Sequence, residues 1–136
     1  TTDQPVECGW LFAGGVLNGV AHTRAKLIAA SKEKTKRILA DGFEYPPASA
    51  AKHTLEPDRR SLYESVKNNR EVLTNIPVIT QANTVIYLPG AIEIAAFYAA
   101  GMARHQAVST IGAELVNEWN AATTIAELEA IVDDRT

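Results

Sequence analysis

The sequence is poor in the residues that build disulfide frameworks and metal centres. It contains one cysteine and three histidines in 136 residues. The single thiol, Cys8, forms neither a disulfide framework nor a zinc site. The formal net charge is −3, whereas a protein that binds duplex nucleic acid is normally basic. The composition therefore predicts an ordinary globular protein with no nucleic-acid partner.

The sequence also lacks a hydrophobic run long enough to cross a membrane. The longest apolar stretches, residues 9–21 and 91–103, are shorter than the ~20 residues that a transmembrane helix requires. Glycines interrupt the first stretch and Glu93 interrupts the second. The start of the sequence has no basic flank of the kind found in signal peptides. We therefore expect no membrane partner, and the length favours a single domain.

Residues 1–21 are predicted to form an extended or hairpin arm. Glycines at positions 9, 14, 15 and 19 each disfavour a helix by roughly 1 kcal/mol relative to alanine. Gly14-Gly15 and Asn18-Gly19 are turn signals, and their spacing matches no phosphate-binding loop. The rest of the chain, residues 22–136, is predicted to form a single helical α+β domain.

Apolar residues at spacings of three and four predict helices over residues 22–42, 57–76, 91–122 and from 124 onward. Gly42 is expected to cap the first helix, and Pro57 suits the first turn of the second. Residues 91–122 form either one long helix or two, and Gly101 and Gly112 are points where the helix kinks or a neighbouring helix approaches closely. Thr124 and Glu127 have the spacing of a capping box.

Short strands are predicted in two regions. Phe43-Glu44-Tyr45 alternates like a strand and stops at Pro46-Pro47. Residues 78–80 and 84–88 are rich in β-branched side chains and form either a hairpin or one bent strand. The expected fold class is α+β and mostly helical, with three or four helices, one or two short strands or a small hairpin, and the extended N-terminal arm.

No group of reactive residues stands out in the sequence. Within the predicted helices, no histidine has a second ligand at the i+3 or i+4 spacing that places two metal ligands on one helix face. Glu114 and Glu118 share a helix face, which we interpret as a solvated one. We predict no catalytic, metal-binding or cofactor-binding residue and no cofactor. One enzymatic alternative stays open, a small hydrolase or transferase that uses His53 or His105 with a carboxylate.

Trp10, Leu11 and Phe12 are the residues most indicative of an interface. Three large apolar side chains in succession on an extended segment point to both of its faces, so one sheet surface cannot bury them all. The arm is therefore either sandwiched inside its own domain or docked on another protein. Exposed aromatic clusters usually mark interfaces, so we name these three residues as interface candidates.

Lys32, Lys36 and Arg37 are further interface candidates because they lie in the basic part of an acidic chain. Residues 24–40 carry a net charge of about +5 and residues 91–136 about −5. The basic segment has neither the interleaved aromatics of a single-strand binding surface nor the Trp or Phe of a membrane-surface helix. The charge pattern predicts that this basic helix faces the acidic C-terminal region, either within one chain or between neighbouring chains. For the basic face itself we expect a solvated surface or a salt-linked contact between subunits.

The order of several motifs resembles a known family. These are Gly9-Trp10-Leu11-Phe12-Ala13-Gly14, a helix closing on Gly42-Phe43, a loop with Lys52-His53-Thr54, a middle helix, and the segment Ala121-Ala122-Thr123-Thr124-Ile125-Ala126-Glu127-Leu128-Glu129-Ala130-Ile131. Together they resemble the domain of unknown function at the C-terminal end of many bacteriophage tail-fibre and tail-assembly proteins. The resemblance covers nearly the whole chain.

The resemblance implies a structural protein of a phage tail, made in the host cytoplasm and built into the virion near the tail fibre or baseplate. It implies other tail proteins as partners, in a homo-oligomer or a hetero-complex, and no known catalytic residues. The family domain usually ends a longer fibre protein, whereas this chain begins shortly before Trp10. We therefore expect an adaptor, or alternatively a tail-fibre assembly chaperone that is not retained in the virion.

Overall fold

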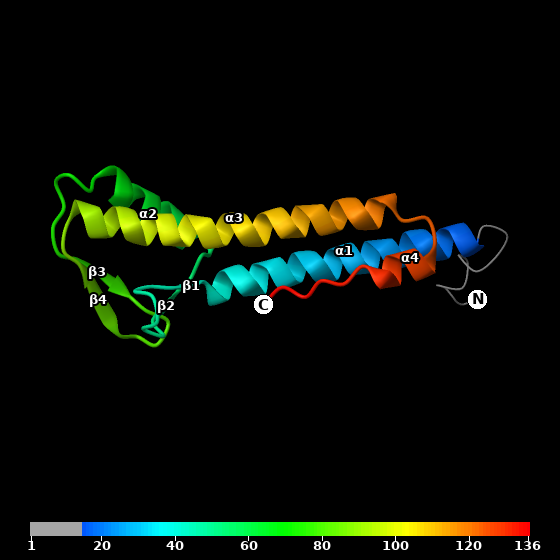
Figure 1. The fold of residues 1–136 in the computed structure, drawn as a ribbon, viewed down its shortest axis with the longest axis horizontal. Helices are drawn as coiled ribbons and strands as arrows, with labels where there is room; N and C mark the ends of the chain where they lie inside the picture. Colours follow the sequence, from blue (N-terminus) through cyan, green and yellow to red (C-terminus); the bar gives the residue numbers. More distant parts are fainter. Residues whose placement is uncertain (1–14) are drawn as a thin grey trace. The chain divides into compact units, whose positions relative to one another are not determined.

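The computed structural model describes residues 15–136, and their side chains from residue 19 onward. The elements follow in the order α1 (Gly15–Asp41), β1 (Phe43–Glu44), β2 (Lys52–His53), α2 (Pro57–Asn68), β3 (Ile76–Ile79), β4 (Val85–Leu88), α3 (Ala91–Ala121) and α4 (Ile125–Ala130) (Figure 1). This arrangement confirms the mostly helical α+β class. The described residues of the predicted single domain are divided between two compact units, and α1 and α3 contribute to both.

The first helix begins earlier than predicted. Residues 15–21 belong to α1, so the prediction of an extended segment is wrong for this part of residues 1–21. The reason is tertiary packing: the Val20 side chain is buried in a cluster with Leu115 and Trp119. Burial of an apolar helix face commonly outweighs the intrinsic preference of single residues such as Gly19. The remainder of the predicted arm, residues 1–14, lies outside the described residues.

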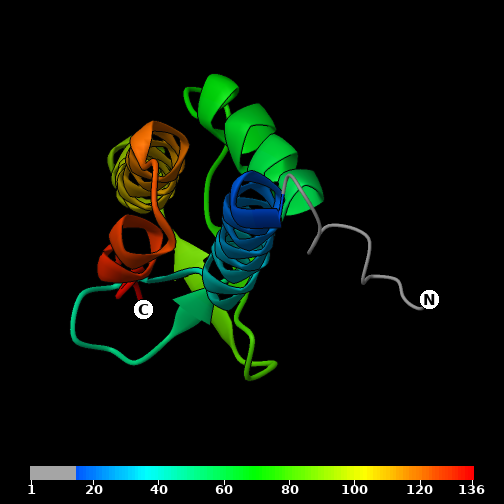
Figure 2. The ribbon, with the colours of Figure 1, turned by 90° about the vertical axis from the view of Figure 1, so that its right-hand side faces the viewer.

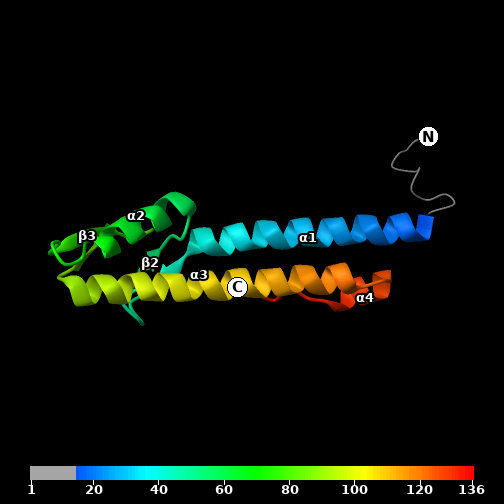
Figure 3. The same ribbon diagram turned by 90° about the horizontal axis from the view of Figure 1, so that it is seen from above.

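The first unit comprises the described residues 15–34 together with 111–136. Within it α1 and α3 run side by side in opposite directions (Figure 3), and α4 joins them to surround a common core (Figure 2). The buried residues of this core are Val20, Leu115, Trp119, Ala122 and Leu128. Arg24 of α1 donates hydrogen bonds to the carbonyl groups of Trp119 and Ala122, at 2.9 and 2.7 Å. A cation therefore caps the C-terminal end of α3, where the helix dipole favours positive charge.

The capping box predicted for the last helix is present in a modified form. The Thr124 hydroxyl accepts a hydrogen bond from the Glu127 backbone N–H at 3.1 Å. The Glu127 carboxylate accepts from the backbone N–H of Thr123 rather than from that of Thr124. This pairing, with a further bond from the Thr123 hydroxyl, lowers the pKa of Glu127. The exchange of bonds fixes the start of α4.

The second unit comprises residues 35–110. Its α2, its β3–β4 hairpin and the first turns of α3 surround one core (Figures 1 and 2). The buried residues of this core are Phe43, Leu55, Tyr63, Val78, Leu88, Ile94 and Phe97. At Gly101 of α3, a Cβ atom would lie 3.0 Å from the Phe43 ring, so the close approach at this glycine is made by a residue of β1 and not by the neighbouring helix that was predicted. The second unit therefore packs aromatic rings directly against the α3 backbone.

Gly42 ends α1 as predicted and also permits the next strand pair. Its φ angle is +81°, and a Cβ atom there would lie 1.8 Å from the His53 carbonyl oxygen. Only glycine fits this combination of left-handed backbone and contact. β1 then pairs antiparallel with β2, with Phe43 opposite His53. β2 lies in a segment that was predicted to be a loop, because two residues are too few to show the alternating pattern of a strand.

The remaining elements agree with the predictions in type and differ in several boundaries, since β3 spans Ile76–Ile79 instead of residues 78–80 and β4 begins at Val85 instead of residue 84. β3 and β4 form an antiparallel hairpin, and α3 is one continuous helix. α2 ends at Asn68 instead of continuing to the residue before Pro77. Asn68 and Asn69 favour turns over helix interiors because their amides compete for backbone hydrogen bonds. Leu73 therefore joins the core from a loop.

Candidate functional site

The β3–β4 hairpin presents an apolar surface on the side away from the core. Side chains alternate along each strand, and those of Val78 and Leu88 are buried. The opposite face consists of the cross-strand pairs Pro77 with Tyr87 and Ile79 with Val85. Ile79, Val85 and Tyr87 are 52%, 48% and 58% exposed. We call these four residues, Pro77, Ile79, Val85 and Tyr87, the hairpin face.

A pocket of about 230 Å³ opens between α2, β3, β4 and α3 in the same unit. Its lining residues are Arg59, Leu62, Tyr63, Val66, Ile76, Pro77, Val78, Ile79, Leu88, Ile94 and Phe97. Tyr63 and Phe97 stand edge to face, with ring centroids 5.0 Å apart. The Tyr63 hydroxyl donates to the Thr54 carbonyl at 3.0 Å, and burial raises the pKa of Tyr63. The pocket is therefore apolar, with Arg59 as its one charged group.

His53 is fully buried among aromatic rings. Its ring centroid lies 5.0 Å from that of Phe97 and 5.5 Å from that of Phe43. Its Nε2 lies 2.8 Å from the Tyr45 carbonyl oxygen and donates to it, which leaves Nδ1 as the unprotonated nitrogen. Nδ1 is buried and has no hydrogen-bond partner among the described residues. Burial lowers the pKa of His53, while the bond to Tyr45 opposes that shift.

The two histidines of the hydrolase or transferase alternative do not meet a carboxylate. The one side-chain hydrogen bond of His53 goes to a backbone carbonyl. For His105, burial and then the charge of Arg60 lower the pKa. In the described part of the chain, neither histidine has a carboxylate within hydrogen-bond distance. The acid–base pair on which that alternative depends is therefore not assembled by these residues.

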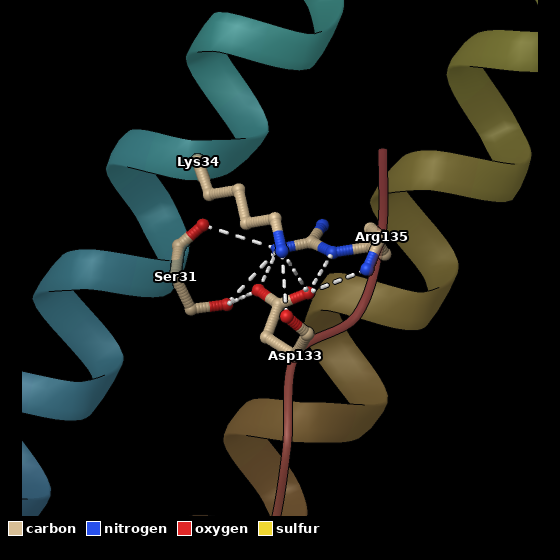
Figure 4. Close-up of polar contacts among 4 residues, drawn as sticks. All are labelled: Ser31, Lys34, Asp133 and Arg135. Carbon is tan, nitrogen blue, oxygen red and sulfur yellow. Dashed lines mark hydrogen bonds and ion pairs between the residues drawn. The ribbon is translucent and has the colours of Figure 1, made fainter.

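A polar cluster joins the C-terminal segment to α1 in the first unit (Figure 4). The Arg135 guanidinium donates to both Asp133 carboxylate oxygens, at 2.8 and 2.6 Å, and to the Ser31 hydroxyl at 3.0 Å. The Ser31 hydroxyl donates to Asp133 at 2.9 Å, and Lys34 Nζ donates to the Asp133 backbone carbonyl at 2.5 Å. The Arg135 side chain is only 4% exposed.

Asp133 and Arg135 form a buried ion pair in this C-terminal cluster. Hydrogen bonding from Arg135, and secondarily from Ser31, holds the pKa of Asp133 well below its usual value despite its burial. The Asp133 carboxylate in turn raises the pKa of Arg135. Both groups are therefore charged throughout the ordinary pH range. The cluster fastens the chain terminus to α1 and has no unsatisfied group that points to a reaction.

The predicted interface residues fall into two groups. Trp10, Leu11 and Phe12 lie outside the described residues. Lys32, Lys36 and Arg37 are exposed on α1, and Lys32 and Lys36 lie one helical turn apart. Their basic neighbours Arg24 and Lys34 are instead bonded to the C-terminal region of the chain. The basic helix therefore contacts the acidic C-terminal region partly within one chain, one of the two arrangements that the charge pattern predicts.

Sequence reasoning missed the C-terminal cluster and the pocket. A signal for the first was Ser31, a polar residue in the apolar stripe of α1. The hairpin face also had a signal, because residues 85–88 are apolar at every position and one face of a two-stranded ribbon cannot bury them all. Arg59 had no such signal in the sequence, since an arginine on a helix is most often solvated.

Three further findings concern metal ligands, membrane spans and similarity to known proteins. Among residues 15–136, no three His, Cys, Asp or Glu side chains gather as a metal site would need. None of the described helices is sufficiently long and apolar to span a bilayer. No family model, curated protein or solved structure that was compared with the chain matches it.

Proposed function

We propose that this chain is a structural protein that acts by docking on other proteins, as an adaptor of a bacteriophage tail fibre or baseplate. The observation that carries the docking role is the hairpin face. Three of its side chains, Ile79, Val85 and Tyr87, are each about half exposed and adjoin one another in the sheet. Contiguous apolar surface rimmed by polar residues is typical of protein interfaces.

The strand edges of the hairpin give a second reason for docking. The described residues place β3 and β4 in a two-stranded sheet, so each strand has one edge without a neighbouring strand. An extended segment of another protein can pair with such an edge through backbone hydrogen bonds. Pro77 has no N–H and interrupts donation from β3, so β4 is the better edge for this pairing.

The phage setting rests on the resemblance in motif order described above. It gives the partners as other tail proteins and the location as the virion. The alternative is an assembly chaperone that leaves before the particle is complete. Mass spectrometry of purified virions separates the two roles: a stoichiometric amount of the chain supports the adaptor, and its absence overturns the adaptor in favour of the chaperone.

The docking role predicts that Trp10→Ala weakens association of the chain. A buried aromatic anchor typically contributes about 2 kcal/mol or more to binding, so the dissociation constant should rise roughly thirtyfold. Sedimentation equilibrium measures self-association, and far-UV circular dichroism checks that the fold is retained.

The matched control for Trp10→Ala is Val72→Ala. Val72 is 80% exposed in the loop after α2, so its truncation also removes exposed apolar surface. We expect association of the Val72→Ala variant to equal that of the unsubstituted chain. Unchanged association in Trp10→Ala, or an equal loss in both variants, contradicts the docking role of Trp10.

A further inference from the structure

We propose that the pocket of the second unit binds a small monocarboxylate with an apolar tail, whose carboxylate pairs with Arg59. This inference goes beyond the docking role, since it concerns a small molecule, although the pocket shares Pro77 and Ile79 with the hairpin face. The floor of the pocket is made by core residues, among them Val78, Leu88 and Phe97. Leu62 and Ile79, about half exposed, form its rim.

The charge of the pocket determines the charge of the ligand's head group. Arg59 lines the pocket and is partly buried, yet in the described part of the chain its guanidinium has no hydrogen bond or ion pair. No acidic side chain lines the pocket. A guanidinium presents a planar fork that matches a carboxylate, and the surrounding apolar surface strengthens that attraction. An anionic head group therefore complements the pocket, whereas a cationic one does not.

Volume decides the length of the tail. At the packing density of a protein interior, about 230 Å³ holds roughly ten non-hydrogen atoms. Octanoate has about that number. Its chain would cover the exposed parts of Leu62 and Ile79 while its carboxylate reaches Arg59. A pocket with few polar groups and one anchoring charge is the usual form of such sites.

The test compares sodium octanoate with octanamide, a neutral ligand of the same length. Each is titrated into the full chain labelled with ¹⁵N, and amide chemical shifts report both the affinity and the location of binding. We expect saturable shifts among the residues of α2, β3 and the start of α3. Octanoate should bind about tenfold or more tightly than octanamide, because only octanoate gains the charge-assisted pair.

Two substitutions test the contacts of the ligand's head group and of its tail separately. Arg59→Gln should reduce octanoate affinity to that of octanamide, while Arg37→Gln, an exposed arginine outside the pocket, leaves both unchanged. Val66→Phe should fill the pocket and abolish binding of both ligands.

Equal affinity of octanoate and octanamide for the unsubstituted chain would overturn the proposal. So would the absence of saturable shifts at millimolar ligand, or shifts confined to the basic residues of α1. The comparison of the two ligands needs no variant, so it decides the question even if a substituted chain fails to fold.

Discussion

His53 makes the stability of the second unit depend on pH through one buried side chain. Its neutral ring is enclosed by aromatic groups, and its unprotonated Nδ1 has no partner that would compensate a charge. The pKa of the folded state is therefore below the ordinary value of 6.5. Between these two pKa values the unfolded chain takes up a proton that the folded chain does not bind.

We predict that the free energy of unfolding falls as the pH drops below about 6.5, by up to roughly 1.4 kcal/mol per pH unit. Above that pH His53 contributes no pH dependence. Urea unfolding, followed by circular dichroism from about pH 8 to pH 5, measures the slope. His53→Gln keeps a hydrogen-bond donor near Tyr45 and should remove most of the slope of the unfolding free energy against pH. His105→Gln should remove less of this slope, because the His105 ring is only partly buried. A full slope in His53→Gln contradicts this assignment.

At the scale of elements, the C-terminal segment shows how a tail without regular structure is held in place. The residues after α4 belong to no helix or strand. They are held instead by the bonds that Arg135 makes to Asp133 and to Ser31. Truncation of one member of a buried pair leaves the other charge without compensation, which typically destabilises a protein by about 3 kcal/mol or more. The buried pair of Asp133 and Arg135 therefore contributes more to the stability of the first unit than exposed ion pairs do.

We predict that Arg135→Ala lowers the free energy of unfolding by about 3 kcal/mol, measured by urea denaturation with tryptophan fluorescence. Arg70→Ala is the control, since its ion pair with Glu71 is exposed and its one further bond goes to the Lys67 carbonyl, so the two together should contribute about 1 kcal/mol or less. Adding Asp133→Asn to Arg135→Ala should destabilise by less than the sum of the single changes, because the two groups are directly coupled. Equal effects of Arg135→Ala and Arg70→Ala would show that the cluster is not a determinant of stability.

Elements whose residues follow a clear apolar pattern were predictable from the sequence, whereas features that depend on contacts between distant residues were not. α3 and the hairpin follow from apolar spacing and β-branched composition, and Gly42 follows from its place after a periodic run. The start of α1 was missed because burial of Val20 against Trp119 is a contact between residues far apart in sequence. The pocket was missed for the same reason, since its walls come from four elements that only the fold brings together.

At the scale of the whole molecule, charge is divided unevenly along the chain, and part of the imbalance is already neutralised. Lys34 lies 3.7 Å from the Asp133 carboxylate, and the two side chains are 25% and 11% exposed. Such partly buried pairs are screened weakly by salt. Lys32 and Arg37 are exposed, and they remain able to pair with the acidic surface of another copy. The fold and the assembly should therefore differ in their response to ionic strength.

We predict that raising the salt concentration from about 0.1 M to about 1 M weakens self-association and leaves the fold intact. The Debye length falls from about 10 Å to about 3 Å over this range, which screens exposed charges across an interface. Sedimentation equilibrium measures association, and circular dichroism follows the fold. In the double variant Lys32→Gln, Arg37→Gln the salt dependence should become smaller, because the exposed cations that carry it are gone. Association that is insensitive to salt in the unsubstituted chain would mean that apolar contact alone holds the copies together.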